Sequence, residues 1–367
     1  MHLTHNCALI ARRFALRNFD HLDRSGASLA QQYADRLEFA ETADRFGFHG
    51  YHIAEHHSTT LGMAPSPSVF LSALTQRTTR MRLGSLVYIL PLYNPLRLVE
   101  EICMLDHLSE GRLDIGVGRG ASPFELAYYG VNITESRAIF DAALDVLMKG
   151  LTGERLSHRD EWFKYSGVPM MLRPLQQPHP PLWFAAGGLE SLEFAAQRGM
   201  NVVAAGVSNY VGRTIKRFHE AWDRGSSQRS RLGIPERTPM VGVRRHVVVA
   251  ETDASAEGVA RPAYKAWGES YALGWRVFNA APTLLVEDYD EARRSELLVV
   301  GSPDTVRREL AKQIAETKLN YLIMSMTFGS MQHREAMRSL DLFASEVMPH
   351  FKTAGEDAEQ NANVVAG

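Results

Sequence analysis

Residues 48–61 have the sequence FHGYHIAEHHSTTL, an apolar segment that leads into a carboxylate and two adjacent histidines, Glu55, His56 and His57. The segment Phe48 to Ala54 is short, bounded by a glycine and directly preceded by a helical pattern, so a strand is predicted there. In an α/β barrel, the loops after the carboxyl ends of the strands form the active face. His56 is therefore our candidate catalytic histidine.

The rest of the chain repeats a pattern of strand followed by helix. The predicted strands cover Asn6 to Phe14, His49 to Ala54, Met81 to Leu90, Leu113 to Val117, Pro181 to Ala185, Asn201 to Ala205, Val241 to Ala250 and Tyr321 to Met326. The predicted helices cover Leu29 to Phe46, Ser66 to Arg77, Pro95 to Leu108, Glu135 to Lys149, Glu190 to Arg198 and Val211 to Asp223. Eight strands joined by right-handed crossovers predict a (β/α)8 TIM barrel, a single domain over residues 1–350.

Two regions do not follow this pattern. Residues 162–180 are rich in proline and lack a clear period, so they are predicted to be an excursion from the barrel. Residues 263–296, between strands seven and eight, exceed one crossover helix. This candidate insertion carries the aromatic residues Trp267, Tyr271, Trp275 and Phe278. Two interpretations stay open, a lid over the site or a helix pair packed on the rim. The tail at residues 351–367 is expected to be disordered.

The charge balance excludes several classes of partner. Forty basic residues against 42 acidic ones give a formal net charge of -2, without the basic surface that nucleic acids or anionic membranes require. No segment approaches the roughly 20 apolar residues needed to span a bilayer. With only Cys7 and Cys103 and no signal-peptide pattern at the start, a cytoplasmic location is expected.

A metal site is one possible interpretation of the histidines. His52 to His56 matches the H-x-x-E-H pattern of zinc peptidases. That pattern functions on a helix, whereas on a strand the two histidines would lie about 13 Å apart. No metal site is therefore predicted.

A glycine cluster, Gly116 to Gly120, follows the fourth predicted strand and contains Arg119. A guanidinium beside glycines at a strand end suits a phosphate or a carboxylate. The alternative is a rim arginine paired with an acid such as Glu125.

A second glycine turn, at Gly187 and Gly188, opens the helix that contains Ser191. Free backbone amides and a hydroxyl at a helix start can hold an anion. The alternative is a tight turn with a capping serine.

Several linked motifs resemble the bacterial luciferase-like flavin-dependent monooxygenases. The matching blocks are Ala54 to His57, Leu83 to Ser85, Leu90-Pro91, Asn94-Pro95, Leu105 to Arg112 and Gly118 to Gly120, in family order and spacing across residues 45–130. Val300 to Pro303 and Arg338 to Leu340 resemble the closing part of that family. The resemblance implies a (β/α)8 barrel with an insertion between its last strands.

The resemblance also implies roles for individual residues. His56 takes the place of the catalytic histidine, and the implied cofactor-binding residues are Arg119, Gly187, Gly188, Ser191, Leu86, Val87 and Asn94. Among them, Leu86 and Val87 fall where the family places a non-proline cis peptide against the flavin ring. Luciferase has acidic and hydroxyl side chains at the two glycine positions, so phosphate contacts there would have to come from backbone amides.

The implied activity is a two-component monooxygenation. A separate flavin reductase supplies reduced FMN, and O2 provides one oxygen atom for a small hydrophobic organic substrate. The candidate pocket residues, which are Tyr88, Tyr93, Phe124, Trp183 and residues of the insertion at 263–296, favour such a substrate. A homodimer is expected from the family.

Two other functions stay open. One is a deazaflavin-dependent oxidoreductase of the same fold. The other is a non-catalytic partner subunit, which would be expected to lack Arg119 and the paired histidines. The role of His57 is not assigned.

Overall fold

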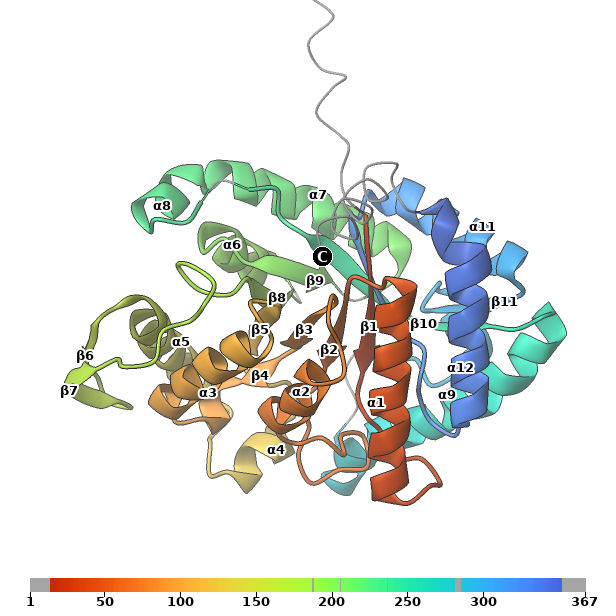
Figure 1. The fold of residues 1–367 in the computed structure, drawn as a ribbon, viewed down its shortest axis with the longest axis horizontal. Coiled ribbons are helices and arrows are strands. Elements are labelled where there is room, and N and C mark those ends of the chain that lie inside the picture. Colours follow the sequence, from red (N-terminus) through yellow and green to blue (C-terminus); the bar gives the residue numbers. More distant parts are fainter. Residues whose placement is uncertain (1–13, 187, 205, 236, 281–284, 352–367) are drawn as a thin grey trace, which may run out of the picture.

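Eight parallel strands close into a barrel in the computed structural model, which describes residues 14–351 except 187, 205, 236 and 281–284 (Figure 1). The strands, in order around the ring, are β1 (Ala15–Asp20), β2 (Gly50–Ile53), β3 (Arg82–Ser85), β5 (Leu113–Gly118), β8 (Leu182–Ala186), β9 (Asn201–Ala204), β10 (Val241–Val249) and β12 (Tyr321–Ser325). Pairing of β9 with β10 and of β12 with β1 closes the ring. The predicted (β/α)8 barrel is confirmed.

Helices surround the strands (Figure 1). They are α1 (Leu29–Phe46), α2 (Pro67–Thr75), α3 (Pro95–Leu108), α4 (Pro123–Tyr128), α5 (Ser136–Thr152), α6 (Leu189–Gln197), α7 (Ser208–Arg224), α8 (Ser226–Arg231), α9 (Asp253–Val277), α10 (Tyr289–Arg294), α11 (Pro303–Thr317) and α12 (His333–Leu342). Short 3-10 or π turns are η1 (Leu90–Leu92), η2 (Phe343–Val347) and η3 (Met348–His350). Local signals set several boundaries: the Ser28 hydroxyl caps the start of α1, and Gly47, with φ of 82°, ends it. In the described residues no helix is both long and apolar enough to cross a membrane.

The first strand was predicted in the wrong place. The predicted segment, residues 6–14, lies outside the described residues apart from Phe14, which is not in a strand. The strand that pairs with β2 and β12 is instead β1, in which all six residues are buried. It carries Arg17, Asn18 and Asp20 among its apolar residues. These buried polar side chains hid the apolar run that a strand buried on both faces normally shows.

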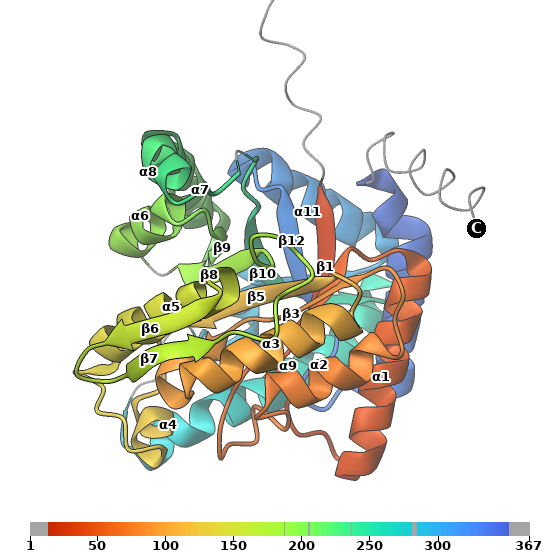
Figure 2. The ribbon, with the colours of Figure 1, turned by 60° about the vertical axis from the view of Figure 1, so that its left-hand side comes forward.

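Three further elements differ from the prediction. The single strand expected at residues 81–90 is divided into β3 and β4 (Tyr88–Ile89), with a cis peptide between Leu86 and Val87. The expected excursion overlaps an antiparallel hairpin, β6 (Arg155–Arg159) and β7 (Lys164–Pro169), which Figure 2 shows outside the barrel along α5. A further parallel strand outside the ring, β11 (Leu298–Gly301), pairs with the carboxyl-terminal half of β10.

The candidate insertion at residues 263–296 starts inside α9 rather than between elements. Its later part contains α10, which packs on α9 through an ion pair of 2.7 Å between Arg261 and Asp290. Residues 281–284 lie outside the described residues, as does the tail beyond Phe351. Of the two interpretations, a pair of packed helices is the one that matches the contact between α9 and α10.

The inside of the barrel contains a polar cluster, called the floor here, and an apolar cluster, called the apolar layer here. In the floor, Asp114 forms ion pairs with Arg17 and Arg82, and His52 lies 2.6 Å from the Tyr321 hydroxyl. The apolar layer contains Ala15, Phe19, Ala54, Trp183, Val203, Tyr321 and Ile323. Because alternate residues of each strand face inward, the next inward residues toward the carboxyl ends line the mouth of the barrel.

Candidate active site

His56 follows the carboxyl end of β2 and is held by a buried carboxylate. Its Nδ1 atom lies 3.1 Å from Oε1 of Glu125, which sits on the short helix α4 after β5. The same oxygen accepts a hydrogen bond of 3.3 Å from the backbone amide of His57. Since a carboxylate accepts hydrogen bonds, Nδ1 of His56 is the donor and its Nε2 atom is free for chemistry. The His56 side chain is 21% exposed, so a ligand can reach it.

His57 stabilises the loop that carries His56. Its Nε2 atom lies 2.8 Å from Glu55 and its Nδ1 atom 2.9 Å from the Tyr129 hydroxyl. Glu55 also accepts hydrogen bonds from the Tyr93 hydroxyl at 2.8 Å and from the Ile89 amide at 3.2 Å. Burial raises the pKa of the Glu55 carboxyl, and these donors act in the opposite direction. His57 therefore joins the loop after β2 to β4 and to the end of α4.

The mouth beside His56 is lined by His21, Arg244 and His246, which were not predicted as site residues, and by Trp267, which lies in the predicted insertion. The ring of His21, directly after β1, lies 5.5 Å from the ring of His56. The indole nitrogen of Trp267, on α9, donates a 3.3 Å hydrogen bond to Nδ1 of His21. Arg244 and His246, on β10, contact the same indole ring. His21 follows the carboxyl end of β1, a position hidden from the prediction because the first strand was expected at residues 6–14. Arg244 and His246 lie within β10.

Helices α9 and α4 cover this mouth. Besides Trp267, α9 contributes Ser270, which accepts a 3.2 Å hydrogen bond from Thr60 in the loop after β2. Phe124 of α4 packs against Phe278, with ring centres 5.4 Å apart, at the end of α9. Residues 263–277 therefore lie over the mouth.

Arg119 follows β5, is exposed, and makes no hydrogen bond or ion pair within the described part of the chain. The proposed pairing with Glu125 is wrong, because that carboxylate holds His56 instead. Strand β5 pairs with β8, with Val117 opposite Phe184, so the loop of Arg119 starts beside the glycine turn that follows β8. The structure thus brings the two predicted anion-binding segments together.

Within that glycine turn, Gly187 lies outside the described residues. The Ser191 hydroxyl accepts a 2.9 Å hydrogen bond from the Gly188 amide and lies 2.6 Å from the Gly188 carbonyl. The serine therefore caps the start of α6 in this structure, and its role toward a phosphate stays a prediction.

The cis peptide between Leu86 and Val87 lies where the resemblance placed it. Gly116 and Gly118 allow β5 to pass close to it: a Cβ atom on Gly116 would lie 2.3 Å from the Ser85 carbonyl oxygen, and one on Gly118 would lie 2.5 Å from a methyl of Val87. These glycines have a packing role. Asn94 is exposed and caps α3, accepting a 3.2 Å hydrogen bond from the Arg97 amide.

The four aromatic residues predicted to line the pocket have other contacts. Tyr88 is fully buried, with its hydroxyl 3.1 Å from Ser68 of α2. Tyr93 holds Glu55, and Phe124 packs on α9. Trp183 lies in the apolar layer, its ring 4.3 Å from that of Tyr321. The walls of the mouth are formed by residues of β1, β10 and α9, and α9 contains the start of the insertion that was also expected to line the pocket.

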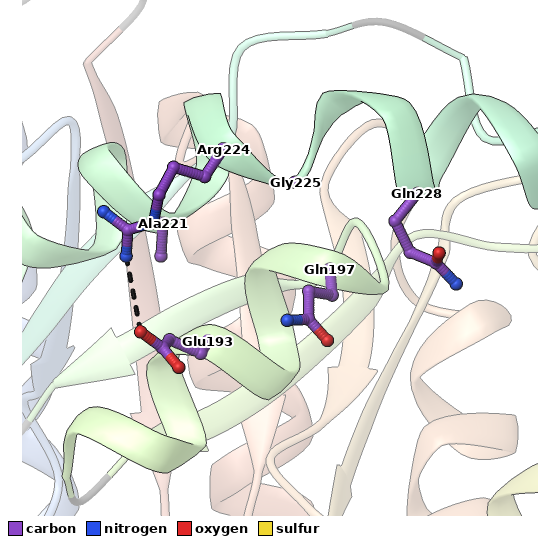
Figure 3. A pocket seen from close by; sticks show the side chains of 6 residues that line it. All are labelled: Glu193, Gln197, Ala221, Arg224, Gly225 and Gln228. Carbon is purple, nitrogen blue, oxygen red and sulfur yellow. Dashed lines mark hydrogen bonds and ion pairs between the residues drawn. The ribbon is translucent and has the colours of Figure 1, made fainter.

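A cavity of 260 Å³ lies elsewhere, between α6, α7 and α8 (Figure 3). It is lined by Glu193, Gln197, Ala221, Arg224, Gly225 and Gln228. These residues lie toward the carboxyl ends of α6 and α7, which places the cavity near the amino-terminal end of the barrel, away from His56. An ion pair of 3.3 Å between Arg224 and Glu193 crosses it. The cavity is separate from the candidate active site.

Four consecutive strands of the ring, β1, β2, β3 and β5, are followed directly by His21, the loop of His56, the cis peptide and Arg119. Such a set on the carboxyl-terminal face defines a (β/α)8 barrel enzyme. The chain belongs to the luciferase-like monooxygenases, since the sequence model of that family matches residues 15–320. It is an oxidoreductase of that family.

Two relatives illustrate this membership. The protein y4wF from Sinorhizobium fredii is 39% identical over 341 residues, covering 93% of this chain and 98% of the relative. The oxygenase component of a flavin-dependent trigonelline monooxygenase from Acinetobacter baylyi is 34% identical over 194 residues, covering 52% of this chain and 53% of that protein.

Solved structures share the fold. Monooxygenase RslO1 from Streptomyces bottropensis has a TM-score of 0.80 at 26% identity, covering 91% of this chain and 99% of that chain. The oxygenating constituent of 3,6-diketocamphane monooxygenase from Pseudomonas putida, in complex with FMN, has a TM-score of 0.75 at 20% identity, covering 92% and 98%. A coenzyme F420 dependent tetrahydromethanopterin reductase from Methanopyrus kandleri has a TM-score of 0.67 at 17% identity, covering 93% and 99%. The last two likenesses extend to the fold alone.

Proposed function

We propose that this protein uses reduced FMN and O2 to insert one oxygen atom into a small organic substrate with a hydrophobic body. The observation that carries the proposal is the hydrogen bond between His56 and Glu125, which fixes an accessible imidazole at the mouth of the barrel. The cis peptide after the neighbouring strand β3 and the unpaired Arg119 supply what a flavin ring and its phosphate would contact.

The flavin, when bound, supplies the electrons that activate O2. Its ring would lie against Leu86 and Val87, and Arg119 would hold its phosphate, beside the glycine turn that follows β8. A guanidinium without an internal partner suits a phosphate, because it can form two parallel hydrogen bonds to it.

His56 would then move a proton at its Nε2 atom. Glu125 holds the Nδ1 hydrogen and thereby fixes the tautomer and the ring orientation. The pair Glu55 and His57 keeps the loop in place, and the His57 amide holds Glu125 in turn.

Exclusion of water is the second requirement, because reduced flavin and O2 in a site open to water yield hydrogen peroxide in place of the oxygenated product. We assign this role to the carboxyl-terminal half of α9, residues 263–277, which covers the mouth through Trp267 and Ser270. This segment is the lid in our proposal.

The test is an oxygen-consumption assay with reductase-supplied FMNH2, ¹⁸O2 and a panel of aldehydes, cyclic ketones, alkenes and organic acids. We expect ¹⁸O in one product. His56→Ala should bind FMN normally, lose product and release more peroxide, whereas His350→Ala, an exposed control in η3, should behave as wild type. Unchanged coupling in His56→Ala would remove His56 from the mechanism.

A binding titration of the same protein identifies its cofactor. Titration with FMNH2 and with a reduced deazaflavin should show tight binding of FMNH2 alone; the reverse preference would assign the chain to the deazaflavin-dependent branch. Failure to bind either would favour a non-catalytic partner subunit.

We further propose a separate reductase, a homodimer and a cytoplasmic location. A relative is named as an oxygenase component, which supports the separate reductase. The Cys103 thiol is free and buried, as expected in a reducing compartment. Size-exclusion chromatography with light scattering tests the dimer, and activity that depends on an added reductase tests the two-component arrangement.

A further inference from the structure

Arg244 is a cation on the inner face of β10 without a counter-ion. The register with β12 sets it beside Ile323, which belongs to the apolar layer. Its guanidinium lies 5.3 Å from the ring centre of Phe19 and 5.4 Å from that of Trp267. Within the described ranges its side chain makes no hydrogen bond or ion pair. The residue is partly accessible, although its Nη1 atom is fully buried.

A second arginine inside the same barrel shows the contrast. Arg17, in the floor, forms an ion pair with Asp114, which also binds Arg82. The barrel thus supplies a carboxylate to the deep arginine, but the described residues supply none to Arg244. Because a partly buried charge without a counter-ion is costly, the presence of Arg244 at this position favours a ligand that pairs with it.

Two neighbours also have unused polar atoms. His246 is 3% exposed and its Nε2 atom has no partner among the described residues, and the same holds for Oγ of Ser325, which is 2% exposed. They are opposite each other in the register of β10 and β12. Native proteins satisfy nearly all buried polar atoms. Three such groups, from Arg244, His246 and Ser325, therefore lie together on the adjacent strands β10 and β12.

The neighbouring titratable groups leave the charge of Arg244 uncompensated. Burial, and then Arg244 itself, lower the pKa of both His21 and His246, so both rings are neutral near pH 7. Burial raises the pKa of Tyr264 to about 12, so its hydroxyl keeps its proton. The site therefore carries one positive charge with neutral hydrogen-bonding groups around it.

We propose that Arg244, His246 and Ser325 bind the carboxylate of an organic acid, and that this acid is the substrate. A guanidinium can hold a carboxylate through two hydrogen bonds, and the imidazole and hydroxyl can donate to it as well. The apolar body of the acid would pack on Phe19 and Trp267, at the side of the mouth that leads to the catalytic histidine. The inference rests on the proposed function and narrows its substrate class to carboxylates.

The test is calorimetric binding of matched pairs, benzoate with benzamide and 3-phenylpropanoate with 3-phenylpropanamide, to the FMN-free and the FMN-loaded protein. Wild type should bind at least one acid roughly tenfold or more tightly than its amide. Arg244→Met should lose this preference with FMN affinity unchanged, and Arg244→Lys should keep part of it. Arg119→Met should show the opposite behaviour, with weaker FMN binding and an intact acid preference.

Thermal unfolding gives an independent measurement. Without a ligand, Arg244→Met should unfold at a higher temperature than wild type, because it removes an unpaired charge. Benzoate or 3-phenylpropanoate should raise the unfolding temperature of wild type but not of the variant. If Arg244→Met does not fold, Arg244→Gln serves for both measurements.

Several outcomes would overturn the inference. These are equal affinity for acid and amide in wild type, no binding of either acid, or weaker FMN binding in Arg244→Met with an unchanged acid preference, which would assign the guanidinium to the flavin. An intact acid preference in a protein that binds no FMN would contradict the proposed function and leave the carboxylate site standing.

Discussion

His56 Nδ1 and Glu125 Oε1 lie 3.1 Å apart, although 69 positions separate the two residues in the chain. One follows β2 and the other lies on α4 after β5, so their contact depends on how the strands are ordered in the ring. This contact makes Glu125 a positioning residue.

Replacing Glu125 with glutamine tests that role. Glu125→Gln should fold and bind FMN, but coupling of O2 consumption to product should fall about 10- to 100-fold, because an amide can also donate to Nδ1 and no longer fixes the tautomer of the histidine. The double variant with His56→Ala should be no worse than His56→Ala alone, since the two residues act as a unit. Additive losses would mean that Glu125 acts independently of His56.

Arg119 should distinguish FMN from riboflavin, which lacks the phosphate. Arg119→Met should weaken FMN binding by about 1.5–3 kcal/mol, the usual contribution of a hydrogen bond to a charged group. Riboflavin binding should stay unchanged, as measured by fluorescence quenching. Equal weakening of both ligands would place the phosphate elsewhere. Arg97→Met, at an exposed arginine on α3, is the control.

His52 should make the fold sensitive to acid. Burial, and then Arg17, lower its pKa to about 3 from an ordinary value of 6.5. The folded state holds the neutral ring, so its stabilising contribution is complete above pH 6.5 and is lost as the pH falls toward 3. The free energy of unfolding should decrease by up to about 1.4 kcal/mol per pH unit in this window on account of this group.

Urea unfolding between pH 8 and pH 4.5 measures this effect. His21 and His246 act in the same direction, so the comparison is between slopes. His52→Gln, which can still bond to the Tyr321 hydroxyl, should have a smaller slope than wild type. Equal slopes in wild type and His52→Gln would contradict the assignment.

Gly329 fixes the position of α9. It has φ of 57°, and a Cβ atom there would lie 1.8 Å from the carbonyl oxygen of Ala263. Gly329→Ala should therefore displace α9, lower stability by about 1–3 kcal/mol and expose the mouth, so that peroxide release increases. Gly258→Ala, in α9 with open space around it, should be neutral or stabilising. Coupling equal to that of wild type in Gly329→Ala would argue against a sealing role for α9.

The sequence alone predicted the elements that local patterns encode. The bounds of α1 and α3 agree with the prediction, because helical periodicity, a capping residue and a terminating glycine or turn all lie within one segment. The number of ring strands and the position of His56 after a strand were also predicted, since short apolar runs between helices mark strands in an α/β chain.

The tertiary structure alone decided which side chains contact one another. Strand β1 was missed because it carries buried polar residues; one of them, Arg17, meets Asp114 from a strand nearly 100 positions away. The glycines of the fourth predicted strand proved to be spacers beside the cis peptide. Among the described residues, Arg17 pairs with a carboxylate and Arg244 does not. This difference depends on where closure of the ring places each side chain. That information is distributed over eight strands and is not present in any local stretch of sequence.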